Sequence, residues 1–160
     1  MRTNSSFMVS PATRLPLALV PEQASRSFKK EADKLQARRT ALLVQQLRDL
    51  VMAPPANTER CRVAFLEANR RVVAIEALGD GQADCLSFSL RGLFRRALMV
   101  DARSMIIAHN HPSGDCLPSQ RDLDTTERIA RIAAELDIEL LDHLIFATSG
   151  LYSMRRGGKL

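Results

Sequence analysis

Residues 104–122 of this chain read SMIIAHNHPSGDCLPSQRD. Ser104–Ala108 is a short, mostly apolar run between polar residues, which is typical of a buried central strand. His109 and His111 follow at the end of this run. Alternate residues of a strand share one face, so the two imidazoles are expected to point the same way and to offer two nitrogens to one metal ion. A proline and a glycine then end the strand and turn the chain.

A helix is predicted to begin at Ser119, because an amphipathic run follows from Leu123 to Leu136. Asp122 lies in the first turn of this helix, where it forms a capping pair with Ser119 and favours the positive helix end. A helix that starts beside the end of the strand would also bring this carboxylate to the imidazoles. Two imidazoles and one carboxylate are the three protein ligands of a catalytic zinc site. Capping and catalytic roles of Ser119 are compatible.

The spacing of these residues resembles a known motif. The stretch resembles the JAMM motif of the MPN metalloproteases in its order of His-x-His, seven residues, Ser, two residues and Asp. The letters HNHPSG, followed later by PS, look like the RadC branch of that family. The resemblance covers roughly residues 60–160. It extends to Leu141–Ile145 and Tyr152–Arg155, which are similar to the last strands of that domain.

This resemblance implies a fold, a cofactor and an activity. The expected fold is the MPN/JAB domain, which is cytidine deaminase-like, and the expected cofactor is Zn²⁺ held by His109, His111 and Asp122. The expected activity is hydrolysis of a peptide or isopeptide bond by a metal-activated water, with a peptide or protein as the substrate. The alternative is a non-catalytic RadC-like module, associated with DNA repair, that binds nucleic acid or protein.

The resemblance also implies which residues assist the reaction. Residues 70–78, RRVVAIEAL, are similar to the RadC segment that holds the family's glutamate, so Glu76 is the expected general base. Ser119 would donate a hydrogen bond to the developing oxyanion. From the residues alone Glu67 is a rival base, because both glutamates lie on or at the end of predicted strands.

Cys116 and His143 are two further candidates. A Cys116 thiolate could occupy the open position of the zinc site, although an unligated loop cysteine is the simpler interpretation. His143 lies beside Asp142 on a late predicted strand, and could either support the site or be a structural histidine.

The composition is typical of one aliphatic-cored domain without a membrane segment. The chain has 160 residues, of which 46% are hydrophobic and 4% aromatic. No run reaches the roughly 18 apolar residues that a membrane span needs, and Leu17–Val20 is too short for a signal peptide. Three cysteines without paired spacing suit a reducing compartment. We therefore expect a cytoplasmic protein.

Three parts are expected along the chain: a flexible arm over 1–24, a basic amphipathic helix within 25–55, and the RadC-like domain over 56–160. Strands and helices mix without a strict repeat in the last part, which predicts an α+β fold with mixed α/β/α layers and a central mixed sheet. Besides the metal-site strand and helix, the expected elements are strands at Cys61–Leu66 and Val72–Leu78, a short strand near Asp84–Phe88, a helix at Leu90–Val100, and strands near Glu139–Thr148 and Leu151–Arg155.

The net charge of +5 lies entirely in the N-terminal part. Residues 1–60 carry ten basic and five acidic side chains, whereas residues 61–160 carry thirteen of each. The apolar residues of the basic helix recur near helical spacing, so the helix is expected to pack against the domain or a second copy, as in a homodimer, with its basic side chains in solvent. Nucleic-acid contact has little support, because the excess charge does not belong to the domain that holds the histidines. No glycine precedes Gly79, so the helix-hairpin-helix region of full-length RadC relatives is expected to be missing.

Overall fold

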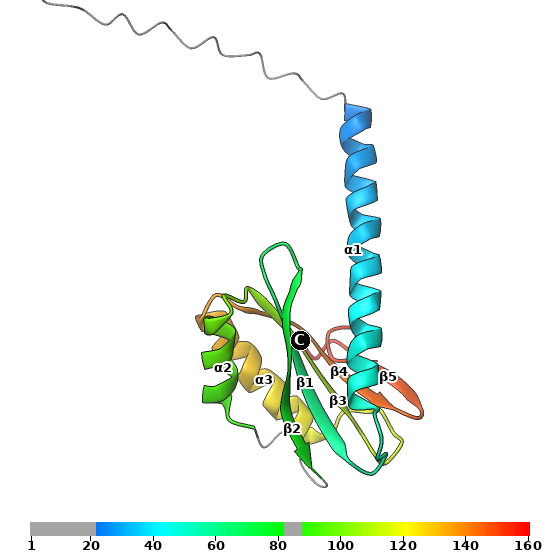
Figure 1. Cartoon of the computed structure of the whole chain (residues 1–160), viewed down its shortest axis with the longest axis vertical. Coiled ribbons are helices and arrows are strands. Elements are labelled where there is room, and N and C mark those ends of the chain that lie inside the picture. Colours follow the sequence, from blue (N-terminus) through cyan, green and yellow to red (C-terminus); the bar gives the residue numbers. More distant parts are fainter. Residues whose placement is uncertain (1–21, 82–87) are drawn as a thin grey trace, which may run out of the picture. The chain divides into compact units, whose positions relative to one another are not determined.

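The computed structural model describes residues 22–81 and 88–160 of the chain. The arm predicted over 1–24 therefore lies mostly outside the described residues, as does most of the short strand predicted near Asp84–Phe88. The elements in chain order (Figure 1) are α1 (Glu22–Val51), β1 (Glu59–Leu66), β2 (Val72–Gly81), α2 (Leu90–Met99), β3 (Ser104–Asn110), α3 (Gln120–Glu135), β4 (Glu139–Ala147) and β5 (Gly150–Ser153). In the part of the chain that is described, no helix has both the length and the apolar character to cross a membrane.

The chain divides into two compact units after Leu35, and the second unit, Gln36–Leu160, contains the five strands. These strands form one mixed sheet in the order β2-β1-β3-β4-β5. β1 is antiparallel to β2 and β3, β3 and β4 are parallel, and β5 is antiparallel to β4. Every residue of β3 is buried, which agrees with the central strand predicted from its apolar run.

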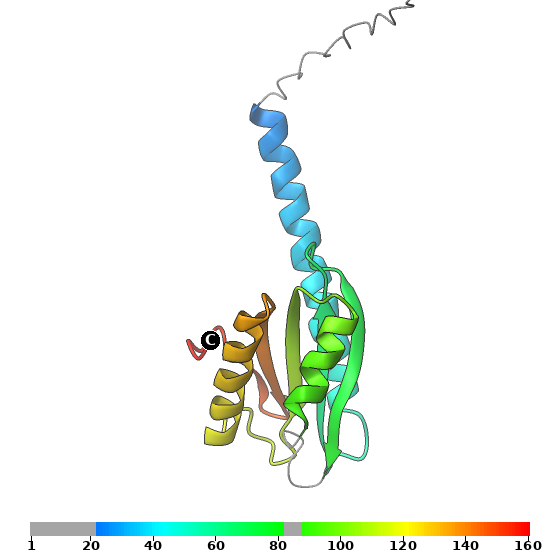
Figure 2. The ribbon, with the colours of Figure 1, turned by 90° about the vertical axis from the view of Figure 1, so that its left-hand side faces the viewer.

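Helices cover both faces of the sheet. In Figure 2, α2 and α3 lie on one side of the strands and the C-terminal half of α1 lies on the other. Successive residues of β3 alternate between two cores: Met105 and Ile107 pack toward α2 and α3, whereas Ile106 and Ala108 pack toward α1. This is the α+β fold with mixed α/β/α layers that the sequence predicts.

The C-terminal half of α1 belongs to the second core. Leu43, Leu47 and Val51 recur at helical spacing and are buried against β1, β3 and β4. Burying each such side chain contributes roughly 1.5–3 kcal/mol. The helix begins at Glu22, before the predicted start, and ends at Val51 just before the two prolines. Its first turns, up to Leu35, belong to the other unit, where Lys34 and Glu31 form an exposed ion pair.

Candidate metal centre

Two histidines at the end of β3 meet at one point. His109 is fully buried on the α3 face of the sheet, and His111 follows just after the strand, where its backbone N–H donates to the carbonyl of Phe146. Their Nε2 atoms lie 2.9 Å apart, and their rings are tilted with centroids 4.8 Å apart. The two imidazoles therefore face a common position, as the His-x-His spacing predicts.

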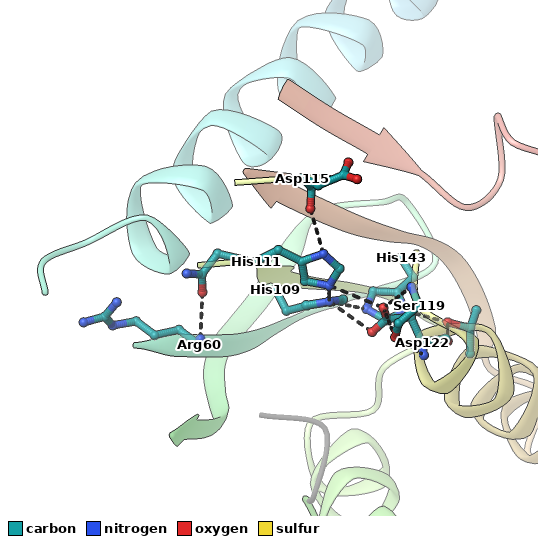
Figure 3. A network of polar contacts seen from close by, with 9 residues as sticks. Arg60, His109, His111, Asp115, Ser119, Asp122 and His143 are labelled. Carbon is teal, nitrogen blue, oxygen red and sulfur yellow. Dashed lines mark hydrogen bonds and ion pairs between the residues drawn. The ribbon is translucent and has the colours of Figure 1, made fainter. Parts of the chain in front are cut away.

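The capping box of α3 delivers a carboxylate to the same position. Ser119 is the N-cap: its Oγ accepts from the Asp122 N–H at 3.2 Å, and the Ser119 N–H donates to Asp122 Oδ2 at 2.7 Å. The Ser119 hydroxyl also donates to Oδ2, at 2.6 Å. Held in this way, the carboxylate places Oδ1 3.1 Å from His109 Nε2 and Oδ2 3.3 Å from His111 Nε2 (Figure 3). Helix capping and placement of Asp122 are thus one arrangement.

The remaining hydrogen bonds of the two imidazoles fix their tautomers. The Nδ1–H of His111 donates to the backbone carbonyl of Asp115 at 2.9 Å, which leaves a lone pair on Nε2. For His109 the partner is His143, whose Nε2 lies 2.8 Å from His109 Nδ1 (Figure 3). The tautomer of His109 therefore depends on that of His143.

A buried threonine settles the tautomer of His143. The single hydroxyl proton of Thr126 is donated to the backbone carbonyl of Asp122, so Thr126 Oγ1 must accept from His143 Nδ1, 2.6 Å away. A neutral His143 then has its lone pair on Nε2 and accepts from the Nδ1–H of His109. His109 is thereby left with a lone pair on Nε2, directed at the same position as that of His111. Metal-binding histidines are usually held by such an outer partner.

The three converging side chains fit a divalent metal ion. Ligands at 2.0–2.1 Å from a tetrahedral ion lie about 3.3 Å from one another, and the distances among His109, His111 and Asp122 are 2.9–3.3 Å. Two nitrogen lone pairs facing each other at 2.9 Å repel unless a proton or a cation lies between them. Imidazole and carboxylate are also the ligand types that zinc prefers.

The electrostatics of the site favour a cation. Burial alone would raise the pKa of Asp122, but hydrogen bonds that the Nε2 atoms of His109 and His111 donate when they carry a proton outweigh it and hold that pKa far below its usual range. The hydrogen bond to Asp122 raises the pKa of His111, against a smaller opposing effect of burial. Burial lowers the pKa of His143 well below 6.5 and keeps this ring neutral. A proton on the imidazoles therefore occupies the place that a metal ion would take.

Glu59 is the second carboxylate at this position, and the sequence analysis did not single it out. One carboxylate oxygen of Glu59 and one nitrogen from each of His109 and His111 lie within 4.8 Å of one another. The pairing of Cys61 with His109 brings the start of β1 beside the end of β3, which explains the placement. Glu59 therefore lies close enough to the two imidazoles to act on a metal ion between them or on a water molecule bound to that ion.

The other candidate residues have different surroundings. The carboxylate of Glu76 forms an ion pair with Arg96 of α2, and that of Glu67 forms one with Arg71 at 2.6 Å. Cys116 is half-buried in the loop after β3, where its backbone N–H donates to the Ser149 hydroxyl. Among the described residues, neither glutamate nor this cysteine is part of the group that converges on the two imidazoles.

Comparison with known proteins identifies the family. The sequence profile of the RadC-like JAB domain matches residues 36–159. A UPF0758 protein of Cupriavidus pinatubonensis is 36% identical over 144 residues, which are 90% of this chain and 63% of the relative. A UPF0758 protein of Thiobacillus denitrificans is 38% identical in an alignment of 136 residues that covers 78% of this chain and 61% of the relative. The chain thus spans about three fifths of the length of these curated relatives. From the matched profile, these identities and the arrangement at the end of β3, we conclude that the chain belongs to the RadC family of JAB-domain proteins.

Proposed function

We propose that the protein is a zinc-dependent hydrolase that cleaves a peptide or isopeptide bond. The observation that carries the proposal is the convergence of His109, His111 and Asp122 on one position, with a carboxylate oxygen of Glu59 within 4.8 Å of a nitrogen of each imidazole. Three protein ligands and a free fourth position are typical of catalytic zinc sites, whereas structural zinc sites are closed by four protein ligands.

A bound zinc ion supplies a water molecule whose pKa is lowered toward about 7, and it polarises the substrate carbonyl. Asp122 and the two imidazoles would hold such an ion. Glu59 accepts the proton of the attacking water and passes it to the nitrogen of the leaving amine, a role worth about 10²–10⁴-fold in rate. We assign this role to Glu59 in place of Glu76, because a carboxylate oxygen of Glu59 lies within 4.8 Å of a nitrogen of each imidazole, whereas the carboxylate of Glu76 forms its ion pair with Arg96 on α2.

Ser119 is the proposed donor to the developing oxyanion. Its side chain is exposed at the first turn of α3, next to the ligand Asp122. Its hydroxyl proton is donated to Asp122 Oδ2, so the proton has to turn toward the substrate when the oxyanion forms. A preorganised donor contributes roughly 3 kcal/mol to lowering the barrier, and the contribution of Ser119 is smaller by the cost of turning its proton away from Asp122.

The experiment that tests the function compares two glutamate variants. The zinc-loaded protein is incubated with a mixture of peptides and with isopeptide-linked protein pairs, and cleavage is followed by mass spectrometry. We expect cleavage that a chelator abolishes, that Glu59→Gln reduces by at least about 10²-fold, and that Glu76→Gln leaves within a few-fold of wild type. Cleavage that survives Glu59→Gln and is lost in Glu76→Gln would assign the base to Glu76. A zinc-loaded protein that cleaves none of these substrates would contradict the proposal.

The substrate in this proposal is a peptide or a protein. A homodimer through the helix within 25–55 stays a prediction, which a measurement of mass in solution would check. Nucleic-acid contact, for which the case is weaker, also stays a prediction, and a binding assay with DNA would check it.

A further inference from the structure

Asn110, the residue between the two histidines, points away from them. Alternation along β3 places His109 on the α3 face and Asn110 on the opposite face, where its side chain is 3% exposed. It does not contact the converging imidazoles and has no place in the proposed chemistry. A buried amide at this point of the chain therefore needs another explanation.

Both polar atoms of the Asn110 side chain bind the backbone on either side of Glu59. Oδ1 accepts from the N–H of Arg60 at 2.7 Å, and Nδ2 donates to the carbonyl of Thr58 at 3.0 Å. An amide is suited to this task because it carries an acceptor and a donor on two separate atoms. A carboxylate has no donor, and a serine hydroxyl is a single atom on a shorter side chain.

This pair of hydrogen bonds extends the contact between β1 and β3. The backbone register of the two strands runs from Leu66 opposite Ser104 to Cys61 opposite His109. Glu59 lies two residues beyond Cys61, past the end of that register. The Asn110 side chain continues the connection across these residues and fixes the peptide units on both sides of Glu59.

The neighbouring contacts of this segment hold other parts of it. The Arg60 guanidinium donates to the carbonyls of Pro54, Pro55 and Thr58, and it thereby holds together the loop that leads into β1. On its other side β1 pairs with β2, where Glu59 is opposite Gly81. β2 is an edge strand of the sheet, so this pairing does not fix the distance from Glu59 to β3.

We propose that Asn110 is a positioning residue that holds the Glu59 carboxylate at its distance from the imidazoles. This inference rests on the part of the proposed function that gives Glu59 a role at the metal. Misplacement of a catalytic group by about 1 Å can cost 10²-fold in rate. Asn110 thus links the histidines and the glutamate of the site through one residue of β3.

The test is a double-mutant cycle on metal binding, which does not depend on hydrolytic activity. Glu59→Gln, Asn110→Ala and the double variant are compared with wild type for zinc affinity, by competition with a chelating dye, and for the visible spectrum of the Co²⁺-loaded protein. Asn69→Ala is the matched control, because Asn69 Oδ1 also accepts a backbone N–H, that of Arg71, at the other end of the β1–β2 hairpin. Asn110→Ser replaces Asn110→Ala if the latter does not fold.

We expect Glu59→Gln to weaken zinc binding by about 10-fold, as loss of an outer partner does, and to change the Co²⁺ spectrum. Asn110→Ala should reproduce both changes and add nothing in the Glu59→Gln background, because both substitutions remove the same interaction. Asn69→Ala should change neither property. In Asn110→Ala the Arg60 amide should also exchange its hydrogen faster than in wild type.

Three results would overturn the inference: wild-type zinc affinity and Co²⁺ spectrum in Asn110→Ala, the same in Glu59→Gln, or effects of the two substitutions that multiply in the double variant. These outcomes are separate from failure of the proposed function. A protein that gives the expected cycle and cleaves no peptide would contradict the hydrolase and support the positioning role.

Discussion

Removing the Thr126 hydroxyl should weaken zinc binding, although Thr126 touches none of the three atoms that would hold the ion. In Thr126→Val the buried Nδ1–H of His143 loses its acceptor, which costs about 1–3 kcal/mol. His143 can avoid that cost by moving its proton to Nε2, but this proton would then face the Nδ1–H of His109. His109 would in turn carry its proton on Nε2, where the metal binds. Zinc binding is penalised because the zinc-bound protein needs the original tautomers, which leave the Nδ1–H of His143 without its acceptor, whereas the metal-free protein avoids that cost by shifting the protons.

We expect Thr126→Val to raise the zinc dissociation constant by about 10–100-fold, the usual cost of losing an outer partner. Thr126→Ser keeps the hydroxyl and should bind zinc within a few-fold of wild type. Dye competition measures the affinity, and ¹⁵N spectra of the metal-free protein report the tautomer of His109. Wild-type affinity in Thr126→Val, or an equal loss in Thr126→Ser, would refute the argument from the tautomers.

Three further predictions concern stability and pH. Ser119→Ala removes the N-cap of α3 and should lower the free energy of unfolding by about 0.5–2 kcal/mol in urea titrations of the metal-free protein; no change would argue against the capping box. Leu47→Ala should lower the free energy of unfolding by about 2–5 kcal/mol in the same assay, because Leu47 is fully buried. Leu42→Ala, at a position that is 64% exposed, should stay within about 0.5 kcal/mol of wild type. Equal losses of stability in the two variants would mean that α1 does not cover the sheet as described. Because the pKa of His111 is raised and zinc must displace its proton, zinc affinity should still rise with pH above 6.5, and an affinity that is already level at that pH would contradict the raised pKa.

The elements around the histidines were predictable because their signals are local. The short apolar run of β3 predicts a buried strand. Ser119 followed by Asp122 is a capping pair that defines where α3 begins. The predicted strand at Cys61–Leu66 and helix at Leu90–Val100 differ from β1 and α2 only at their ends. Membership of the RadC family follows from the same motif, and the profile match confirms it.

Glu59 was missed because its signal is not local. The predicted strand began at Cys61, since Glu59 and Arg60 are polar and do not continue the apolar pattern, whereas β1 begins at Glu59. The polar start of β1 is held by partners that are distant in sequence, namely β2 and the Asn110 side chain. The three glutamates of the β1–β2 hairpin look alike in sequence, and only strand register decides which one meets the histidines. The partnership of His143 with His109 has the same origin, because it depends on the parallel pairing of β3 with β4.

The central claim is that His109, His111 and Asp122 hold one metal ion, and zinc content tests it most directly. The protein is loaded with zinc, freed of excess by gel filtration and measured by elemental analysis, beside Asp122→Ala and Asp124→Ala. Asp124 is the matched control, since it lies on the same helix and its carboxylate bonds to Gln120. We predict about one zinc per chain in wild type and Asp124→Ala and almost none in Asp122→Ala. Wild-type protein without zinc, or Asp122→Ala with as much zinc as wild type, would contradict the account.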